Sequence, residues 1–178
     1  MKKRTALTIT AALLISTSAF AQSVGEKTGV NSTLGISPTT ADFVKEAAMS
    51  DMTEIAAANL GKDRGNAQEK TFATQMVTDH TKTSEELKSM APADAKAAIP
   101  SALDSSSQSK IDKLKDAKPD DFSSDFDSMQ VSAHKDAVSL FERYAKGGDD
   151  PKLKDWAGKT LPTLRHHLEM AQSLGKTK

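Results

Sequence analysis

A glycine- and proline-marked turn between two amphipathic segments is the feature that most constrains this chain. The turn reads KGGDDP (residues 146–151), with Gly at the end of one segment and Pro at the start of the next. Gly just past one helix and Pro just inside another is the expected order at a helix–helix joint. The apolar positions on both sides recur at helical spacing. The sequence therefore predicts a helical hairpin over about residues 121–174.

Each of the two predicted helices carries a histidine on its apolar stripe. The first stripe holds His134 and the second holds His167. The other members of the two stripes are Val131, Val138, Phe141 and Ala145 in the first, and Leu153, Ala157, Leu164, Ala171 and Leu174 in the second. A histidine where an apolar residue would normally lie is the first candidate for a functional residue.

Two more helices are predicted upstream. One begins near Thr39, where Asp42 forms a weak capping pair, and ends at Gly61. The next begins at Asn66, with Glu69 in the capping-box position, and is stopped by Pro92. The stripe of this second helix contains Phe72, Met76, His80, Thr83, Leu87 and Met90. A long connection, with a short helix capped by residues 101–104 and bearing Leu103, Ile111 and Leu114, leads to the hairpin.

Two hairpins joined by one long crossover have the connectivity of ferritin-like bundles. No stretch alternates with period two for long enough to indicate a strand, and aromatic residues make up only 4% of the chain. We therefore predict an all-α, ferritin-like four-helix bundle over residues 39–174. A flexible leader is expected over residues 22–38, where no period is visible, and a tail over 175–178.

The first 21 residues have the three parts of a secretory signal. A basic start (KKR, residues 2–4) precedes a short apolar run, and Ala19 and Ala21 form a small-x-small cleavage site. We expect cleavage near Ala21 and export to the periplasm, with no transmembrane helix in the mature chain, since no later segment approaches about 18 consecutive apolar residues. Without cysteine the chain is not a lipoprotein and has no thiolate ligand or nucleophile.

Charge argues against nucleic acid as a partner. Residues 22–178 hold 21 basic and 24 acidic residues, a net charge of −3, and no basic stripe occurs. An envelope protein is a conceivable partner, and the sequence does not indicate an oligomeric state.

Three histidines are predicted to lie at one level of the bundle. His80 lies 14 residues after Asn66, His134 lies 13 before Gly147, and His167 lies 16 after Pro151. At about 1.5 Å per residue these depths agree within roughly one turn. Glu54 would lie about 10 Å off that level if the helix ends align. His166 is off the stripe and is expected to face solvent.

These residues permit three interpretations. In the first, His80, His134 and His167 bind a transition metal with Glu54 completing the set, and Asp79, Met76 and Met170 surround it. In the second, the histidines form a buried polar network that only fixes the packing. In the third, they bind a small ligand or respond to pH. Carboxylate-bridged di-iron chemistry is disfavoured because the chain contains no Glu-x-x-His.

Four segments together resemble the bacterial family called domain of unknown function 4142. They are residues 43–48 (FVKEAA) with Glu54, 72–80 (FATQMVTDH) with Leu87, 134–141 (HKDAVSLF) and 160–168 (TLPTLRHHL). The resemblance implies an exported protein with a ferritin-like bundle, and members of the family are often labelled predicted outer membrane proteins. It also implies that Glu54, Asp79, His80, His134 and His167 are the family's recurring polar positions. His166 and Ser84 depart from the residues usual there, and the resemblance supplies no activity.

Three functions remain open on these grounds. The first is a non-enzymatic, stress-related periplasmic protein that holds a metal ion or small ligand at its histidines. The second is a structural or interaction module of the cell envelope. The third, a metal-dependent enzyme, is the least favoured because no general base or nucleophile is otherwise arranged, so we predict that the protein is not an enzyme.

Overall fold

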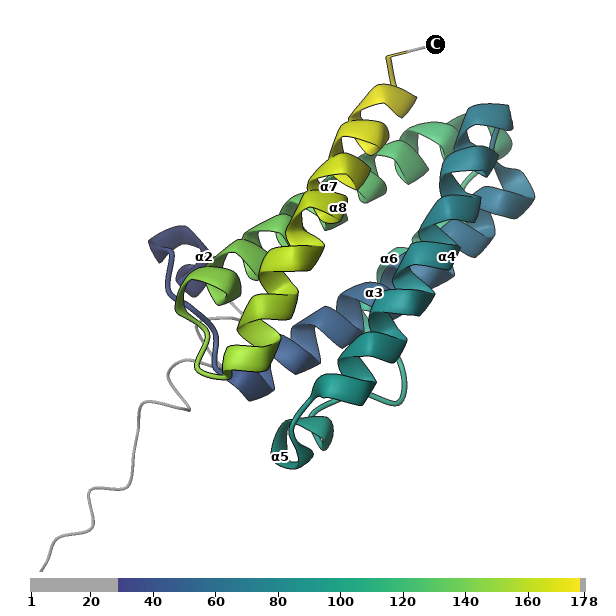
Figure 1. Cartoon of the computed structure of the whole chain (residues 1–178). Helices are drawn as coiled ribbons and strands as arrows, with labels where there is room; N and C mark the ends of the chain where they lie inside the picture. Colours follow the sequence, from purple (N-terminus) through teal and green to yellow (C-terminus); the bar gives the residue numbers. More distant parts are fainter. Residues whose placement is uncertain (1–28, 177–178) are drawn as a thin grey trace, which may run out of the picture.

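The computed structural model describes residues 29–176, and these residues form seven helices and no strand. The predicted signal sequence and cleavage site lie outside the described residues. Four long helices dominate: α3 (Thr40–Arg64), α4 (Ala67–Met90), α7 (Pro119–Gly147) and α8 (Pro151–Leu174). The shorter helices are α2 (Val30–Leu34), α5 (Ala93–Lys96) and α6 (Ser105–Asp116). The prediction of an all-helical protein is therefore confirmed (Figure 1).

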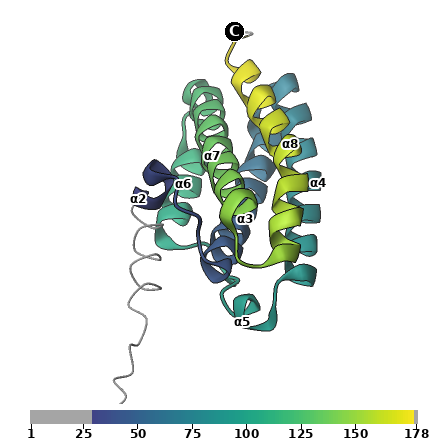
Figure 2. The same cartoon turned by 60° about the vertical axis from the view of Figure 1, so that its left-hand side comes forward.

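The long helices form two hairpins, α3 with α4 and α7 with α8, which pack against each other through α3–α7 and α4–α8 contacts. The crossover is the connection from the end of α4 to the start of α7. It contains α5, directly after α4, and then α6 (Figures 1 and 2). Two hairpins joined by one long crossover is the predicted connectivity, which ferritin-like bundles share. No helix in the described part of the chain is long and apolar enough to cross a membrane.

Side-chain caps begin the helices of the first hairpin, as the sequence predicts. The Thr39 hydroxyl accepts a hydrogen bond from the Asp42 amide at the start of α3. At the start of α4, Asn66 accepts from the Gln68 and Glu69 amides, and the Glu69 carboxylate accepts from the Asn66 amide. This capping box satisfies backbone donors that have no partner inside the helix. In the second hairpin Asp150 caps α8 through the Leu153 amide, whereas α7 begins at Pro119 without a side-chain cap.

The prediction that α3 ends at Gly61 is wrong, because the helix continues to Arg64. Gly61 is buried inside the helix instead of terminating it. A Cβ atom built there would lie 2.6 Å from the Phe126 ring and 3.0 Å from the Ala73 methyl carbon. The glycine is needed because α7 and α4 approach the α3 backbone closely at this point, which sequence pattern alone does not distinguish from a helix end.

Arg64 at the end of α3 holds the crossover in place. Its guanidinium donates to the carbonyls of Leu114, Lys115 and Ala117, which lie at the end of α6 and in the loop after it. The same guanidinium lies 4.3 Å from the centre of the Phe122 ring at the start of α7. One side chain thereby satisfies the last carbonyls of α6 and fixes where α7 begins.

The buried face of α7 is rotated by one position from the predicted stripe. Val131, Val138 and Ala145 are only partly buried, whereas His134 and Phe141 are buried as expected. The remaining buried side chains of α7 are Phe122, Phe126, Asp127, Gln130, Ala137, Leu140 and Tyr144. A stripe drawn on apolar residues alone missed Gln130, which is fully buried.

The apolar core is divided into two clusters. One gathers around Phe43, Leu87, Tyr144 and Trp156, at the end of the bundle where α3 and α8 begin. The other gathers around Phe72, Met76, Phe126 and Leu174 and the inner face of α6. Between them lies a layer of buried polar side chains. Its members are Asp51, Glu54, His80, Gln130, His134 and His167.

The described part of the predicted leader, residues 29–38, includes a short helix. It contains α2, which packs against α7. The Ser32 hydroxyl forms a hydrogen bond with that of Ser139, and Arg143 donates to the Ile36 carbonyl. These contacts come from α7, so the local sequence of residues 29–38 gives no sign of them.

Candidate metal centre

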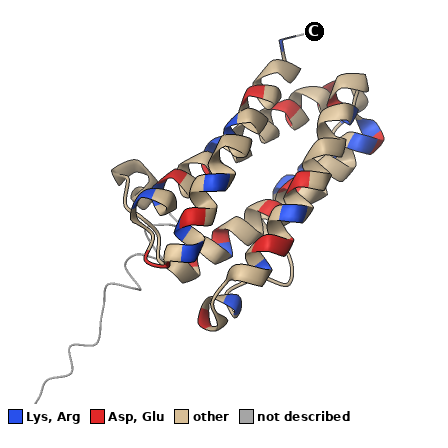
Figure 3. Ribbon diagram, viewed as in Figure 1, with Lys and Arg blue, Asp and Glu red and all other residues tan. Residues whose placement is uncertain are grey.

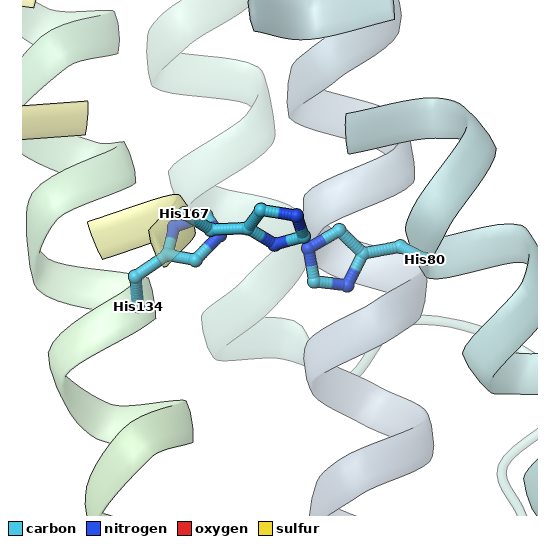
Figure 4. Close-up of side chains that lie close together, drawn as sticks. All are labelled: His80, His134 and His167. Atoms are coloured by element: carbon cyan, nitrogen blue, oxygen red, sulfur yellow. The ribbon is translucent and has the colours of Figure 1, made fainter. Parts of the chain in front are cut away.

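The three histidines predicted to lie at one level converge in the bundle core. His80 comes from α4, His134 from α7 and His167 from α8, and each is at most 2% exposed. Their ring centres are 5.5 to 5.6 Å apart. One nitrogen from each ring lies within 4.8 Å of the other two. Figure 4 shows the three side chains meeting in the interior from their separate helices.

His80 is held by Asp51 of α3. The His80 Nδ1 atom lies 2.8 Å from Asp51 Oδ1, and the other carboxylate oxygen accepts hydrogen bonds from the hydroxyls of Thr83 and Ser84. A carboxylate accepts hydrogen bonds, so the proton of this pair belongs on His80 Nδ1. Nε2 is then the nitrogen that His80 turns toward the other two rings.

His134 is held by its own helix. Its Nδ1 atom lies 2.9 Å from the backbone carbonyl of Gln130, one turn earlier in α7. A carbonyl can only accept, which places the proton on Nδ1 and leaves Nε2 as the second nitrogen. The edge of the Phe72 ring, with centres 6.1 Å apart, packs beside this imidazole and limits its movement.

His167 is held by Asp79, which lies on the neighbouring helix α4. The His167 Nε2 atom lies 2.9 Å from Asp79 Oδ2, so Nε2 carries the proton and Nδ1 is the remaining nitrogen. The two side chains differ in exposure, at 2% for His167 and 30% for Asp79. Asp79 therefore reaches from the buried histidine to the protein surface.

The three remaining nitrogens are those that lack a partner. His80 Nε2, His134 Nε2 and His167 Nδ1 are buried and make no hydrogen bond within the described residues. In neutral imidazoles all three carry lone pairs, because the protons are fixed on the opposite nitrogens. When all three rings are neutral, three acceptors thus face one another and no described residue donates to them, an arrangement that is costly in a core unless a cation lies among them.

Electrostatics keeps two of the imidazoles neutral. Burial, reinforced by the neighbouring His80, lowers the pKa of His134 to about 3 and lowers the pKa of His167. For His80, burial also opposes the charged form, but the hydrogen bond to Asp51 and its negative charge outweigh burial and raise the pKa. A neutral imidazole is the form that binds a metal, so His134 and His167 are ready ligands at neutral pH.

Glu54 is buried beside the histidines without joining the group of three. Glu54 is 1% exposed, and neither of its carboxylate oxygens makes a hydrogen bond of normal geometry with the described residues, although the Gln130 amide lies close enough to influence it. Burial raises the pKa of this carboxyl from its ordinary value of 4.5 to about 7, while His80 and Gln130 act in the opposite direction. Among the described residues, the convergent ligand atoms are those of the three histidines.

The other residues singled out by the sequence have different environments. Met76 is fully buried and Met170 partly buried, and both belong to the apolar cluster around Phe72. His166 is exposed, with its ring 4.0 Å from Glu169 on the next turn. The two methionines therefore pack in the apolar cluster on the Phe72 side of the histidines.

Asp51 and Gln130 are the site residues that the sequence reasoning missed. Asp51 lies three residues before Glu54 and four after Ala47, so it lies on the same stripe of α3. Gln130 lies four residues before His134 on α7. A search for polar residues one turn away from the candidate ligands would have found both.

The comparisons with known proteins agree with the resemblance seen in the sequence. Residues 25–174 match the family described as "Domain of unknown function (DUF4142)". That match covers most of the chain, so the protein belongs to this family. No curated protein and no solved structure matches. The family description assigns no activity, so the function has to be argued from the site.

Proposed function

We propose that this member of the domain of unknown function 4142 family is an exported protein that binds one transition-metal ion through His80 Nε2, His134 Nε2 and His167 Nδ1. One observation carries the proposal. Each histidine has one buried ring nitrogen to which no described residue bonds, and one nitrogen of each ring lies within 4.8 Å of one nitrogen of the other two. The opposite nitrogens are fixed by Asp51, the Gln130 carbonyl and Asp79.

The outer hydrogen bonds support a metal more strongly than the histidines alone. Metal-bound histidines usually donate their second N–H to a carboxylate or a backbone carbonyl, which fixes the tautomer and makes the ligand more basic. Here all three imidazoles have such an acceptor. A site used only for packing needs a donor for each inward nitrogen, and none of the described residues donates a hydrogen bond to these three.

The donor set favours an ion that accepts imidazole ligands. Three neutral nitrogens without a thiolate suit Zn(II) or Cu(II), and three histidines with an open fourth position is an arrangement known for zinc. With bonds of about 2.1 Å, nitrogens on a tetrahedral ion lie about 3.4 Å apart, so the rings would move slightly inward from their present spacing. Two acidic partners, Asp51 and Asp79, would balance a divalent charge.

The metal content of the purified protein tests the proposal. The protein is purified without chelators and its metal is measured by mass spectrometry, followed by thermal unfolding with added Zn, Cu, Fe or Ni. Replacing His80, His134 or His167 by Ala should abolish stoichiometric metal and the gain in melting temperature. His166→Ala, which removes an exposed histidine beside His167, is the matched control. A wild-type protein with no bound metal and no gain in melting temperature would refute metal binding.

The same preparation tests export. The basic start, short apolar run and Ala19-Phe20-Ala21 site support cleavage after Ala21. The mass of the protein recovered from the periplasm should then correspond to a chain that begins at Gln22. A full-length chain retained with the cytoplasm or the inner membrane would contradict export.

A further inference from the structure

A groove between α4 and α8 approaches the histidines from the surface. It has a volume of about 810 Å³, and both helices contribute charged and hydroxyl side chains to its walls. Side chains of both charge signs are interspersed along these two helices (Figure 3). Its lining includes Asp79, Thr83, Glu85, Glu86, Lys159 and Thr163.

Two lining residues of this groove are also supports of the buried histidines. Asp79 accepts the hydrogen bond of His167, and Thr83 donates to the carboxylate that holds His80. A second groove, of about 450 Å³ between α7 and α8, has no residue that bonds to any of the three histidines. The α4–α8 groove is therefore the surface feature that is in direct contact with the site.

Asp79 contacts both the solvent and His167, one of the three histidines with an inward lone pair. It is the partly exposed partner of a histidine that is otherwise enclosed, and the inward nitrogen of that histidine is buried and has no partner in the described part of the chain. A carboxylate at the mouth of a low-dielectric site concentrates cations there and can bind one directly. If the Asp79 side chain turns toward the groove, its hydrogen bond to His167 breaks, and the contact that separates the site from the groove is lost.

Resting on the proposed metal site, we propose that the ion enters and leaves through the α4–α8 groove, and that Asp79 binds the incoming cation before the three imidazoles do. Asp79 is a positioning residue for His167 in the closed state and a transient ligand during transfer. Lys82 and Lys159 on the groove walls are partly compensated by Glu86 and Asp155, at 3.9 and 2.6 Å, so they leave the approach open to a cation.

The rates of zinc uptake and release test this route. Full-length protein freed of metal is mixed with Zn²⁺ in a stopped-flow instrument with a zinc-indicator dye, and release is measured after adding a chelator. Thr163→Trp places a large side chain in the groove without touching a histidine support. A blocked route raises a barrier and leaves the end states unchanged. Uptake and release should therefore slow by at least about tenfold each, with Kd unchanged.

Ser132→Trp is the matched control. Ser132 is an exposed small residue in mid-helix that lines the second groove, and its replacement should leave both rates unchanged. If Thr163→Trp loses helicity by circular dichroism, Ser89→Trp on the α4 wall provides the second block. Zinc uptake by the blocked variant at the wild-type rate, or equal slowing by the control, overturns the route.

Asp79→Asn tests the transient ligand separately. The amide oxygen can still accept from His167 Nε2, but the negative charge is gone. Uptake should slow and lose much of its dependence on ionic strength, because the charge that attracts the cation is absent. Unchanged uptake with unchanged salt dependence would overturn this role. A wild-type protein that takes up no zinc at all would instead refute the metal site itself, so the two failures are distinguishable.

Discussion

Replacing Glu54 by glutamine should make the metal-free protein more stable at neutral and basic pH and leave it little changed in acid. Glu54 is a buried carboxyl whose oxygens make no hydrogen bond of normal geometry within residues 29–176. Burial raises its pKa from an ordinary 4.5 to about 7. Glutamine has nearly the same shape and never ionises, so the comparison isolates the cost of charging this site.

The magnitude follows from the difference in pKa between the folded and unfolded states. Below pH 4.5 both states hold the proton, and the carboxyl does not make stability depend on pH. Between pH 4.5 and 7 the unfolded chain loses the proton while the folded protein keeps it, so the free energy of unfolding falls as pH rises. At about 1.4 kcal/mol per pKa unit, the total loss for Glu54 is about 3 kcal/mol by pH 8.

Urea unfolding with a chelator present, from pH 4 to pH 8, measures this effect. The gain of the Glu54→Gln variant over wild type should grow by about 3 kcal/mol across that range. Glu85→Gln removes one negative charge from an exposed position of α4 and controls for the change in net charge. If the difference between the Glu54→Gln variant and wild type is the same at pH 4 and pH 8, the reasoning about this carboxyl is refuted.

Three further substitutions test the packing, the capping and the histidine supports. Gly61→Ala should lower the free energy of unfolding by about 1–3 kcal/mol, because the added Cβ lies 2.6 Å from the Phe126 ring; a higher urea midpoint would contradict this. Asn66→Ala removes the capping box of α4 and should cost about 1 kcal/mol, measured in the same way. Asp51→Asn should weaken zinc binding about 10- to 100-fold in a dye competition, since the negative partner of His80 is lost; an affinity within twofold of wild type would argue against this support.

Helix positions and histidine depth could be predicted because both depend on local, periodic information. The caps at Thr39 and Asn66 and the turn before Pro151 mark helix starts that the structure confirms. Counting residues from helix ends placed His80, His134 and His167 at one level, and their rings do meet. The rise per residue is nearly constant, so depth along a helix is a quantity that sequence conveys well.

Rotation about a helix axis and contacts between helices were less predictable. Asp51 and Gln130 were overlooked because an apolar stripe does not show which polar residues share its face. Gly61 was taken for a helix end because the ring of Phe126, 65 residues later, decides its role. The tautomers of His80 and His167 depend on Asp51 and Asp79, which come from other helices, and no local pattern specifies such partners.

The polar layer between the two apolar clusters also affects how the bundle opens. Each cluster has its own aromatic contacts, Phe43 with Tyr144 in one and Phe72 with Phe126 in the other, and the histidines lie between them. Without an ion, three mutually facing lone pairs join the halves weakly, so backbone amides on the two sides should exchange with deuterium as separate cooperative units. An ion bound to helices α4, α7 and α8 would link the halves, and exchange would then proceed through a single opening of the whole bundle.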